Sequence, residues 1–367
     1  MAPVLQPAPI TFKPLYVEKV WGGRALNTIL GKDIPKNLPI GESWEISAIS
    51  GSESNVASAP YIGMPLSSVV AAQQQNLLGT NITTPTFPLL YKFIDANDKL
   101  SIQVHPNDMQ AQAMELGNYG KTECWYIVDT KPGTQLICGF KDGVDMAAVQ
   151  KAIADGCLPS LCNYIDIQAG DVVFVPAGTM HATLSGTLLY EIQQSSDTTF
   201  RFYDWDRVDD SGKPRALHIK QALEVLDTTY HNCHVIHPVI IEQTDGITRT
   251  IRVACRYFAL EEYSIAHNTV FTLPHRASFQ VITVLSGSIT LRTPEQTTSV
   301  GSGDSALIPA NLLEYTMQAD AATHVLVSYV PDIATDIVAP IKAIGIPVAD
   351  IEQLGGNPAR NDVQRYL

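Results

Sequence analysis

Short runs of apolar residues, separated by Gly, Pro, Asn and Asp, fill most of the chain. These runs are rich in β-branched and aromatic residues, which is typical of strands bounded by turns. The clearest predicted strands are Leu89–Ile94, Leu100–Val104, Glu123–Val128, Gln135–Gly139, Asp171–Val175 and Thr187–Gln193. Two segments, Asp145–Ala154 and Leu217–Leu226, instead have apolar residues at helical spacing. The pattern predicts a mainly β protein, a barrel or sandwich with a few helical insertions.

A short internal repeat links the two halves of the chain. GDVVFVPAGTMH, from Gly170 to His181, is similar to GDSALIPANLLE, from Gly303 to Glu314. In both, Gly-Asp favours a turn, the apolar run is typical of a buried strand, and Pro ends that strand. Upstream, GTQLICG has a counterpart in GSITLRT. The repeat predicts two related β-barrels.

Composition narrows the class of protein. The 367 residues are 45% hydrophobic and 17% charged, which favours a folded chain over a disordered one. A net charge of −13 without a basic patch argues against nucleic-acid binding. No apolar stretch approaches the roughly 18 residues of a membrane span, and the Pro-rich start lacks the features of a signal peptide. We therefore expect a soluble, cytoplasmic protein with no membrane partner. Its six scattered cysteines are predicted to be free thiols in a reducing compartment.

Four residues with metal-ligating side chains cluster in the predicted strands of the first half. Gln103 and His105 are two residues apart on one strand, so both point to the same face. Glu123 opens the next strand, and His181 ends the first copy of the repeat. Alone, His105 would be interpreted as a hydrogen-bonded loop residue. Together, two imidazoles, a carboxylate and an amide oxygen predict a site for zinc or a similar divalent ion, catalytic if one position stays open.

These residues lie in recognisable motifs. The run that ends at His181 fits the second metal motif of the cupin superfamily. FPLLYKFIDANDKLSIQVHPND, GKTECWYI, VPAGTMHA and EIQQSSDTTFRFYDWDR resemble the type I phosphomannose isomerases in their shorter bacterial form, as do GESWEIS and the WGG at Trp21. The resemblance is strong from about Pro14 to Arg207 and looser beyond.

The resemblance implies two cupin-like β-barrels of the jelly-roll type. Residues 1–240 would form a metal-containing catalytic domain with helical insertions, and 241–367 a degenerate cupin-like domain. In the second repeat Glu314 stands where His181 does, and a rough alignment places Gln280 where Glu123 stands. We therefore expect no second metal.

The same resemblance implies an activity and a cofactor. The family interconverts mannose 6-phosphate and fructose 6-phosphate, and a cis-enediol intermediate is expected for such a reaction. One Zn²⁺ per chain would be held by four ligands: Gln103, His105, Glu123 and His181. Manganese, cobalt and iron suit the same ligand types, so the sequence leaves the metal open.

Four further residues match active-site positions of the family. Arg201, in SDTTFR, matches its catalytic arginine, whose fixed positive charge would stabilise the enediol. Glu191 and Asp197 match acidic residues that line the site, and Lys121 matches a lysine beside the metal. Any of these three could move the proton, and the sequence does not rank them.

The sugar phosphate needs cationic partners, and on an acidic chain these must be local. The candidates are Lys92, Lys121, Arg201 and Arg207. Arg207 could instead form a surface ion pair with Asp204 or Asp206. Lys92 either points into the site or marks the outer face of its strand, and the second is slightly favoured. Trp21 either stacks on the sugar or fills the mouth of the barrel.

Rival interpretations remain. His231, His234 and His237 have helical spacing around Cys233, but a polar domain junction is favoured there over a metal site. A non-catalytic sugar-binding or regulatory cupin is an alternative function, and a cupin iron oxygenase is another. The complete ligand set together with Arg201 favours the isomerase. The oligomeric state is left open.

Overall fold

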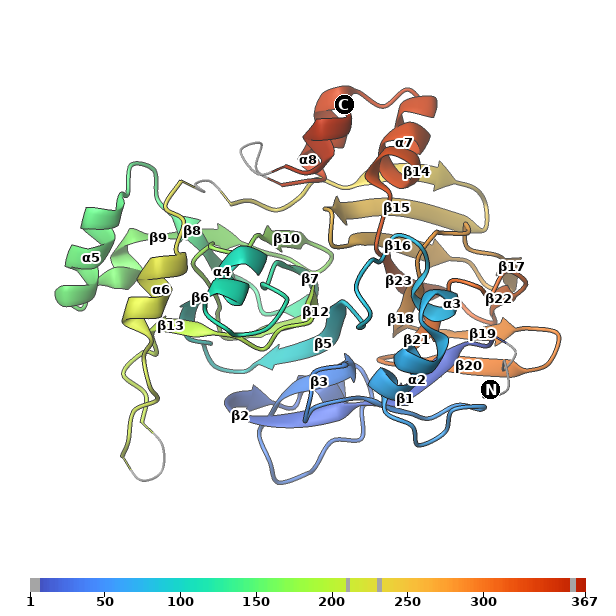
Figure 1. Ribbon diagram of the computed structural model, residues 1–367, viewed down its shortest axis with the longest axis horizontal. Coiled ribbons are helices and arrows are strands. Elements are labelled where there is room, and N and C mark those ends of the chain that lie inside the picture. Colours follow the sequence, from blue (N-terminus) through green and yellow to red (C-terminus); the bar gives the residue numbers. More distant parts are fainter. Residues whose placement is uncertain (1–6, 209–211, 230–232, 357–360) are drawn as a thin grey trace.

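A computed structural model describes residues 7–208, 212–229, 233–356 and 361–367. These residues form a mainly β structure of two units that lie side by side, each built from a larger and a smaller antiparallel sheet (Figure 1). The predicted fold class is confirmed. All six predicted strands and both predicted helices are present, with ends shifted by at most a few residues.

The first unit has a six-stranded sheet in the order β10-β7-β12-β5-β3-β2 and a five-stranded sheet in the order β13-β6-β11-β8-β9. The strands of the larger sheet are β2 (Leu15–Gly23), β3 (Ile40–Ile46), β5 (Leu89–Ala96), β7 (Glu123–Thr130), β10 (Val172–Val175) and β12 (Thr187–Gln194). Those of the smaller sheet are β6 (Ile102–Val104), β8 (Gln135–Phe140), β9 (Cys162–Asp166), β11 (His181–Thr183) and β13 (Phe200–Tyr203).

The second unit has an eight-stranded sheet in the order β14-β15-β16-β23-β18-β21-β1-β4 and a four-stranded sheet in the order β17-β22-β19-β20. The strands of the larger sheet are β1 (Ile10–Lys13), β4 (Asn55–Val56), β14 (Val239–Gln243), β15 (Ile247–Ala254), β16 (Ala259–Ile265), β18 (Gln280–Ser286), β21 (Ser305–Ile308) and β23 (Thr323–Tyr329). Those of the smaller sheet are β17 (Thr269–Phe271), β19 (Ser288–Arg292), β20 (Thr297–Gly301) and β22 (Thr316–Ala319).

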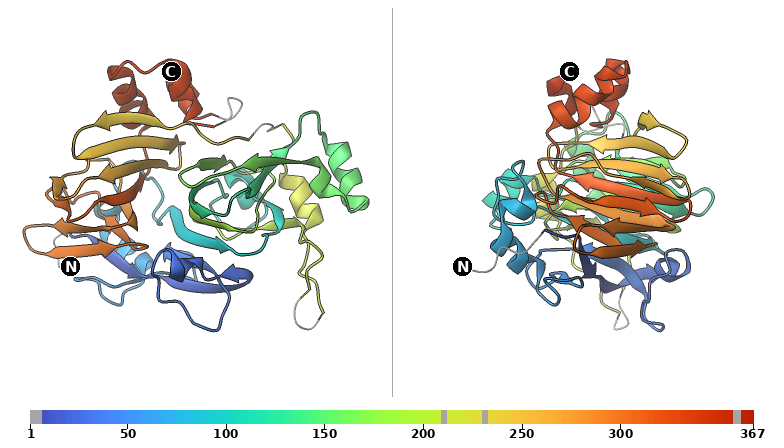
Figure 2. Two further views of the ribbon diagram at one scale, coloured as in Figure 1. Left: turned by 180° about the vertical axis from the view of Figure 1, so that it is seen from behind. Right: turned by 90° about the vertical axis from the view of Figure 1, so that its right-hand side faces the viewer.

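Helices decorate both units without forming a layer of their own (Figures 1 and 2). They are α1 (Ala25–Thr28), α2 (Leu66–Gln73), α3 (Gln75–Leu78), α4 (Asp108–Ala113), α5 (Met146–Ala154), α6 (Ile219–Val225), α7 (Ala339–Ala343) and α8 (Val348–Gln353), with short 3-10 turns η1 (Leu158–Leu161) and η4 (Val363–Tyr366) and a π-helical turn η2 (Ile333–Val338). Asp145 caps α5 by accepting a hydrogen bond from the Ala148 N–H, which explains the start of the predicted helix. None of the helices in the described ranges is both long and apolar enough to cross a membrane.

The internal repeat is real at the level of strand pairing. In the second unit's larger sheet the neighbouring strands run β21-β18-β23-β16-β15-β14. They correspond one by one to β10-β7-β12-β5-β3-β2 of the first unit. Glu123 pairs with Val175 across β7 and β10, and Gln280 pairs with Ile308 across β18 and β21. The predicted correspondence of Gln280 with Glu123 therefore holds in the register. Gln280 donates its side-chain amide to the Pro274 carbonyl.

The larger sheets of the two units pack against each other through their outer faces. Tyr91, Cys124 and Tyr190 from the first unit share one hydrophobic cluster with Val281 and Leu326 from the second. Because side chains alternate along a strand, the neighbouring residues on β5, β7 and β12 point the other way, into the first unit. The inward-facing side chains of these three adjacent strands are therefore buried inside the first unit.

The N-terminal strands connect the two units. Although β1 and β4 precede most of the first unit in sequence, β1 pairs with β21 of the second unit and with β4. Phe12 lies opposite Val56 in this pairing. The division into 1–240 and 241–367 stays a prediction, but the chain before residue 60 contributes strands to both units.

The prediction that all cysteines are free thiols is wrong. Cys138 on β8 and Cys233 form a disulfide across 95 residues, with Cα atoms 5.7 Å apart. Folding brings these distant positions together inside the first unit, and nothing in their spacing indicates it. Cys233 is therefore unavailable as a metal-ligating thiolate beside His234 and His237, and His231 lies outside the described residues.

Candidate active site

The four predicted metal ligands meet at one end of the first unit. His181 opens β11 and pairs with Gln103 of β6, so the two side chains lie side by side. His181 Nε2 is 3.2 Å from Glu123 Oε1 and 3.4 Å from Gln103 Nε2. His105 Nε2 is 3.7 Å from Glu123 Oε2. One ligand atom from each of His105, Glu123 and His181 lies within 4.8 Å of the others, and all three residues are buried.

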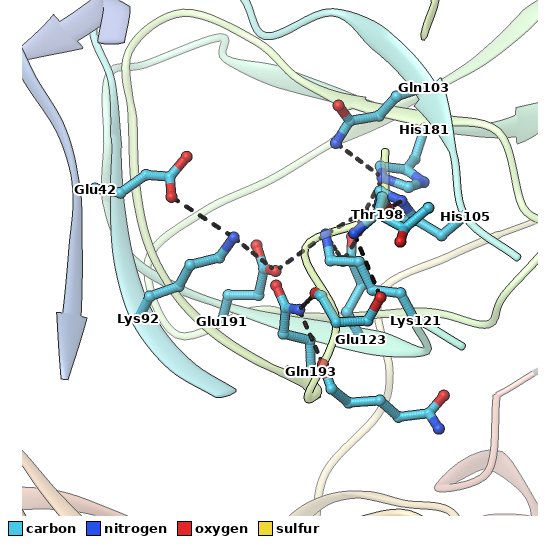
Figure 3. A network of polar contacts seen from close by, with 12 residues as sticks. Glu42, Lys92, Gln103, His105, Lys121, Glu123, His181, Glu191, Gln193 and Thr198 are labelled. Atoms are coloured by element: carbon cyan, nitrogen blue, oxygen red, sulfur yellow. Dashed lines mark hydrogen bonds and ion pairs between the residues drawn. The ribbon is translucent and has the colours of Figure 1, made fainter. Parts of the chain in front are cut away.

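Both histidines are oriented for metal binding. His105 Nδ1 contacts the Thr198 carbonyl at 2.8 Å (Figure 3). His181 Nδ1 contacts the Thr179 carbonyl at 2.9 Å. Each ring therefore donates Nδ1–H to the backbone and directs the Nε2 lone pair into the site. Burial, followed by the nearby Lys121 charge, lowers the pKa of His105 well below its usual value and that of His181 to about 3. Two neutral imidazoles beside a carboxylate fit a divalent metal ion.

Lys121 lies next to these ligands. Its Nζ is 2.7 Å from Glu123 Oε2 and 3.1 Å from His105 Nε2. The residue is buried, and on its other side Nζ is 3.6 Å from Glu191 Oε1. Lys121 thus links the metal-ligand cluster to the polar groups on the sheet.

A row of alternating charges crosses the larger sheet from Lys19 to Lys121, and Figure 3 shows it from Glu42 onward. Lys19 Nζ lies 3.1 Å from Glu42 Oε1, and Lys92 Nζ lies 3.9 Å from Glu42 Oε2. Lys92 Nζ also lies 3.3 Å from Glu191 Oε1. The row follows the strand order β2, β3, β5 and β12 and ends at Lys121, just before β7, so each charge has opposite charges as neighbours. Mutual pairing offsets much of the cost of burying these charges.

The two carboxylates of this row have opposite pKa shifts. Burial alone would raise the pKa of Glu42, but Lys92, Lys19 and a hydrogen bond from the Trp44 indole N–H outweigh it and lower the pKa to about 2. Burial, reinforced by the negative charge of Glu123, raises the pKa of Glu191 despite its lysine neighbours. Glu191 is therefore a buried carboxylate with raised proton affinity that is not among the predicted metal ligands.

A cavity of about 260 Å³ opens above these groups. Arg201 lines it from β13, and its buried Nε has no hydrogen-bond partner among the described residues. Burial and then the neighbouring Arg215 lower the pKa of the Arg201 guanidinium. Arg215 and His218 line the same side, and Arg215 is held by two hydrogen bonds to Asp204. This side of the cavity is suited to an anionic ligand.

Most of the other predicted site residues line the same cavity. Trp21 is buried in its wall, and Lys92 points inward, so the slightly favoured outer-face interpretation of Lys92 is wrong. Asp197 lies at the wall but is exposed. Arg207 is not among the cavity-lining residues, and its guanidinium pairs with Asp204, the alternative stated for it above.

Four titratable residues of the cavity lining were not among the predicted site residues: Lys19, Glu42, Arg215 and His218. Glu42 lies within GESWEIS, one of the motifs that resemble the family, and its charge could have indicated a position in the site. Arg215 and His218 follow the last motif, and folding brings them back against Arg201. Arg215 lies in a loop and His218 at the start of α6, so no periodic pattern in the sequence indicates that they face the cavity.

Two family models match the chain. Residues 10–131 match the catalytic domain of type I phosphomannose isomerase, and residues 248–330 match the cupin domain of mannose-6-phosphate isomerase. Among curated proteins, the probable mannose-6-phosphate isomerase GmuF of Bacillus subtilis is 36% identical over 310 residues, which is 84% of this chain and 96% of GmuF. The mannose-6-phosphate isomerase ManA of the same organism is 35% identical over 311 residues, with the same coverage.

A solved structure agrees with these relatives. The crystal structure of the mannose 6-phosphate isomerase from Bacillus subtilis superposes with a TM-score of 0.80 at 34% identity, covering 88% of this chain and 100% of that one. A putative mannosephosphate isomerase from Archaeoglobus fulgidus, at 20% identity and a TM-score of 0.69, shares the fold. Near-complete coverage at this identity shows that the chain belongs to the type I phosphomannose isomerase family.

Proposed function

We propose that this chain interconverts mannose 6-phosphate and fructose 6-phosphate and uses one zinc ion per chain. The observation that carries the proposal is the convergence of His105, His181 and Glu123 in one buried cluster, whose Glu123 lines a cavity together with Arg201 and two buried lysines. The four ligands would be His105, His181, Glu123 and, through its amide oxygen, Gln103. Family membership and the names of the relatives support the reaction.

The reaction moves a proton between C2 and C1 of the open sugar and passes through a cis-enediol. When bound, a divalent ion would act as a Lewis acid that stabilises negative charge on the enediol oxygens. Arg201, which pairs with Gln103 across β13 and β6, would add a fixed positive charge beside the candidate ligands, and its unpartnered Nε leaves a donor free for substrate oxygen.

We assign the proton transfer to Glu191. Of the three candidates, Glu191 is buried, has a raised pKa and is not a metal ligand, so it keeps the proton affinity that a general base needs. Lys121 lies against the ligands Glu123 and His105, which suits it to charge stabilisation. Asp197 is exposed at the mouth, where it would orient the sugar.

The phosphate would lie on the side of Arg201, Arg215 and His218. Arg201 and Arg215 supply two guanidinium groups there, and Asp204 already pairs with Arg215. Trp21 would contact the sugar from the opposite wall. A doubly charged phosphate ester does not cross membranes unaided, which supports a cytoplasmic location with a small-molecule partner.

The test is a coupled assay on protein that has been stripped with a chelator and then refilled with zinc. The expected result is loss of turnover on stripping, its return on refilling, and a loss of at least a hundredfold in Arg201→Ala with zinc still bound. Glu224→Gln, on the exposed face of α6, serves as the matched control. A full metal site without turnover would favour the non-catalytic cupin, and oxygen uptake with bound iron would favour the oxygenase.

A further inference from the structure

The segment that carries Lys121 and Glu123 is anchored to the second unit through side chains. The Tyr257 hydroxyl, from the β15–β16 connection, donates to Asp108 Oδ2 at 2.9 Å. Asp108 Oδ1 accepts two more hydrogen bonds, from the Gly120 N–H at 2.7 Å and from Gln194 Nε2 at 2.8 Å. One carboxylate at the start of α4 therefore joins the second unit to two segments of the first.

Gln194 continues this path to the active site. Its side-chain oxygen accepts from the Thr122 N–H at 2.9 Å, and its own N–H donates to the Thr122 carbonyl at 3.1 Å. Both residues are buried, with exposed fractions of 2% for Gln194 and 5% for Thr122. Thr122 lies between Lys121 and Glu123. Hydrogen bonds between Gln194 and both the N–H and the carbonyl of Thr122 therefore hold the backbone from which these two side chains project.

These anchors matter because the preceding chain has little regular structure of its own. The residues between the end of α4 and the start of β7 form no strand or helix. Gly120 approaches the backbone of α4 so closely that an added Cβ would lie 2.5 Å from the Asn107 carbonyl carbon. Backbone contacts hold part of this segment, because Glu123 pairs with Val175 and Gln193 and the Lys121 N–H donates to the Pro106 carbonyl. The side-chain hydrogen bonds centred on Asp108 add to these contacts and hold the connection that leads to Glu123.

We propose that Asp108 and Tyr257 are positioning residues, through which the second unit sets the orientation of Glu123 and raises the affinity of the first unit for its metal. The proposal rests on the metal site of the proposed function. It assigns a role in metal binding to a unit that contributes none of the four candidate ligands. Outer partners of metal ligands typically change metal affinity by about 10- to 100-fold when removed.

The experiment measures the dissociation constant of zinc alone by competition with a chromogenic chelator, so it does not depend on turnover. The variants are Asp108→Ala, Tyr257→Phe and the double variant. We expect the dissociation constant to rise about tenfold in Asp108→Ala and at least threefold in Tyr257→Phe. Because both act on one path, the double variant should bind zinc no more weakly than Asp108→Ala.

Tyr126→Phe is the matched control. Tyr126 on β7 also donates its hydroxyl to a carboxylate of the other unit, Glu262, but has no connection to Thr122. Its zinc affinity should stay within twofold of the wild type, even if its melting temperature falls as far as that of Tyr257→Phe.

Three results would overturn the proposal. These are zinc affinities within twofold of the wild type in both single variants, an equal loss in Tyr126→Phe, or multiplicative losses in the double variant. If Asp108→Ala does not fold, the comparison of zinc affinity between Tyr257→Phe and Tyr126→Phe decides the question. A protein that binds zinc as predicted but has no isomerase activity would contradict the proposed function and leave this inference standing.

Discussion

Lys92 and Glu191 lie directly opposite each other on β5 and β12, with Lys92 Nζ 3.3 Å from Glu191 Oε1. Lys121 lies on the other side of the same oxygen at 3.6 Å. A buried carboxylate is thus held between two ammonium groups at the wall of the cavity. This arrangement keeps Glu191 in place without making it a metal ligand.

Replacing Glu191 by Gln should remove proton transfer while keeping the shape of the side chain. We expect kcat to fall by about 10²- to 10⁴-fold, the usual contribution of a general base, with zinc bound at one ion per chain. Steady-state kinetics and metal analysis of the same preparation check this. A kcat within threefold of the wild type would show that Asp197 or Lys121 moves the proton instead.

The buried Glu42 predicts a specific dependence of stability on pH. Its pKa is about 2 in the folded protein against 4.5 for the ordinary group. The native state therefore favours the charged form, and the resulting stabilisation is complete above pH 4.5 and is lost as the pH falls toward 2. The contribution is about 3 kcal/mol at neutral pH.

Glu42→Gln tests this dependence. The difference in free energy of unfolding between the wild type and the variant should be constant from pH 7 to 5 and should shrink below pH 4.5. Denaturant unfolding at several pH values measures it, with the exposed Glu224→Gln as the control. A difference that is independent of pH down to 3 would mean that Lys19 and Lys92 do not stabilise the Glu42 carboxylate.

The disulfide between Cys138 and Cys233 should stabilise the protein measurably. Closing a loop across 95 residues restricts the unfolded chain, and such cross-links typically contribute about 2–4 kcal/mol. Reduction, or Cys233→Ser, should lower the free energy of unfolding by that amount. The exposed free cysteine Cys157 provides the control, since Cys157→Ser should show no such loss. Equal stability of reduced and oxidised protein would contradict the prediction.

Trp21 depends on a glycine for its place in the cavity wall. A Cβ added at Gly41 would lie 2.5 Å from Trp21 Cζ3 and 2.7 Å from Lys19 Cβ, so Gly41→Ala must displace both side chains that flank it. We expect kcat/KM to fall about tenfold, because a misplacement of about 1 Å of a substrate-positioning group can cost up to about 10²-fold in rate, while zinc affinity is unchanged. Gly301→Ala, where an added Cβ would meet its nearest atom, Asp304 Oδ2, at an ordinary 3.6 Å, is a control for the substitution itself. If Gly41→Ala has wild-type kinetics, Trp21 does not contact the sugar.

The ligand cluster was predictable because its residues lie in strands with a clear pattern. Gln103 and His105 share a face by their spacing, and the repeat that ends at His181 fixes the strand before it. The correspondence of Gln280 with Glu123 followed from the same repeat and holds in the strand register.

Other features depend on contacts between distant segments, which no local pattern encodes. The strand of Lys92 is buried on both faces because the second unit covers its outer side, so the slight preference for an outward lysine failed. Cys138 pairs with a cysteine 95 residues away, and Arg215 reaches the cavity from a connecting loop. In each case the tertiary packing decides the position.

The central claim is metal-dependent isomerisation through an enediol, and NMR in D₂O tests it most directly. Zinc-loaded protein is predicted to convert mannose 6-phosphate to fructose 6-phosphate with solvent deuterium appearing at C1, and chelator-stripped protein to give neither product nor deuterium. Equal conversion by the stripped protein, or no conversion by protein with one zinc ion bound per chain, would contradict the account.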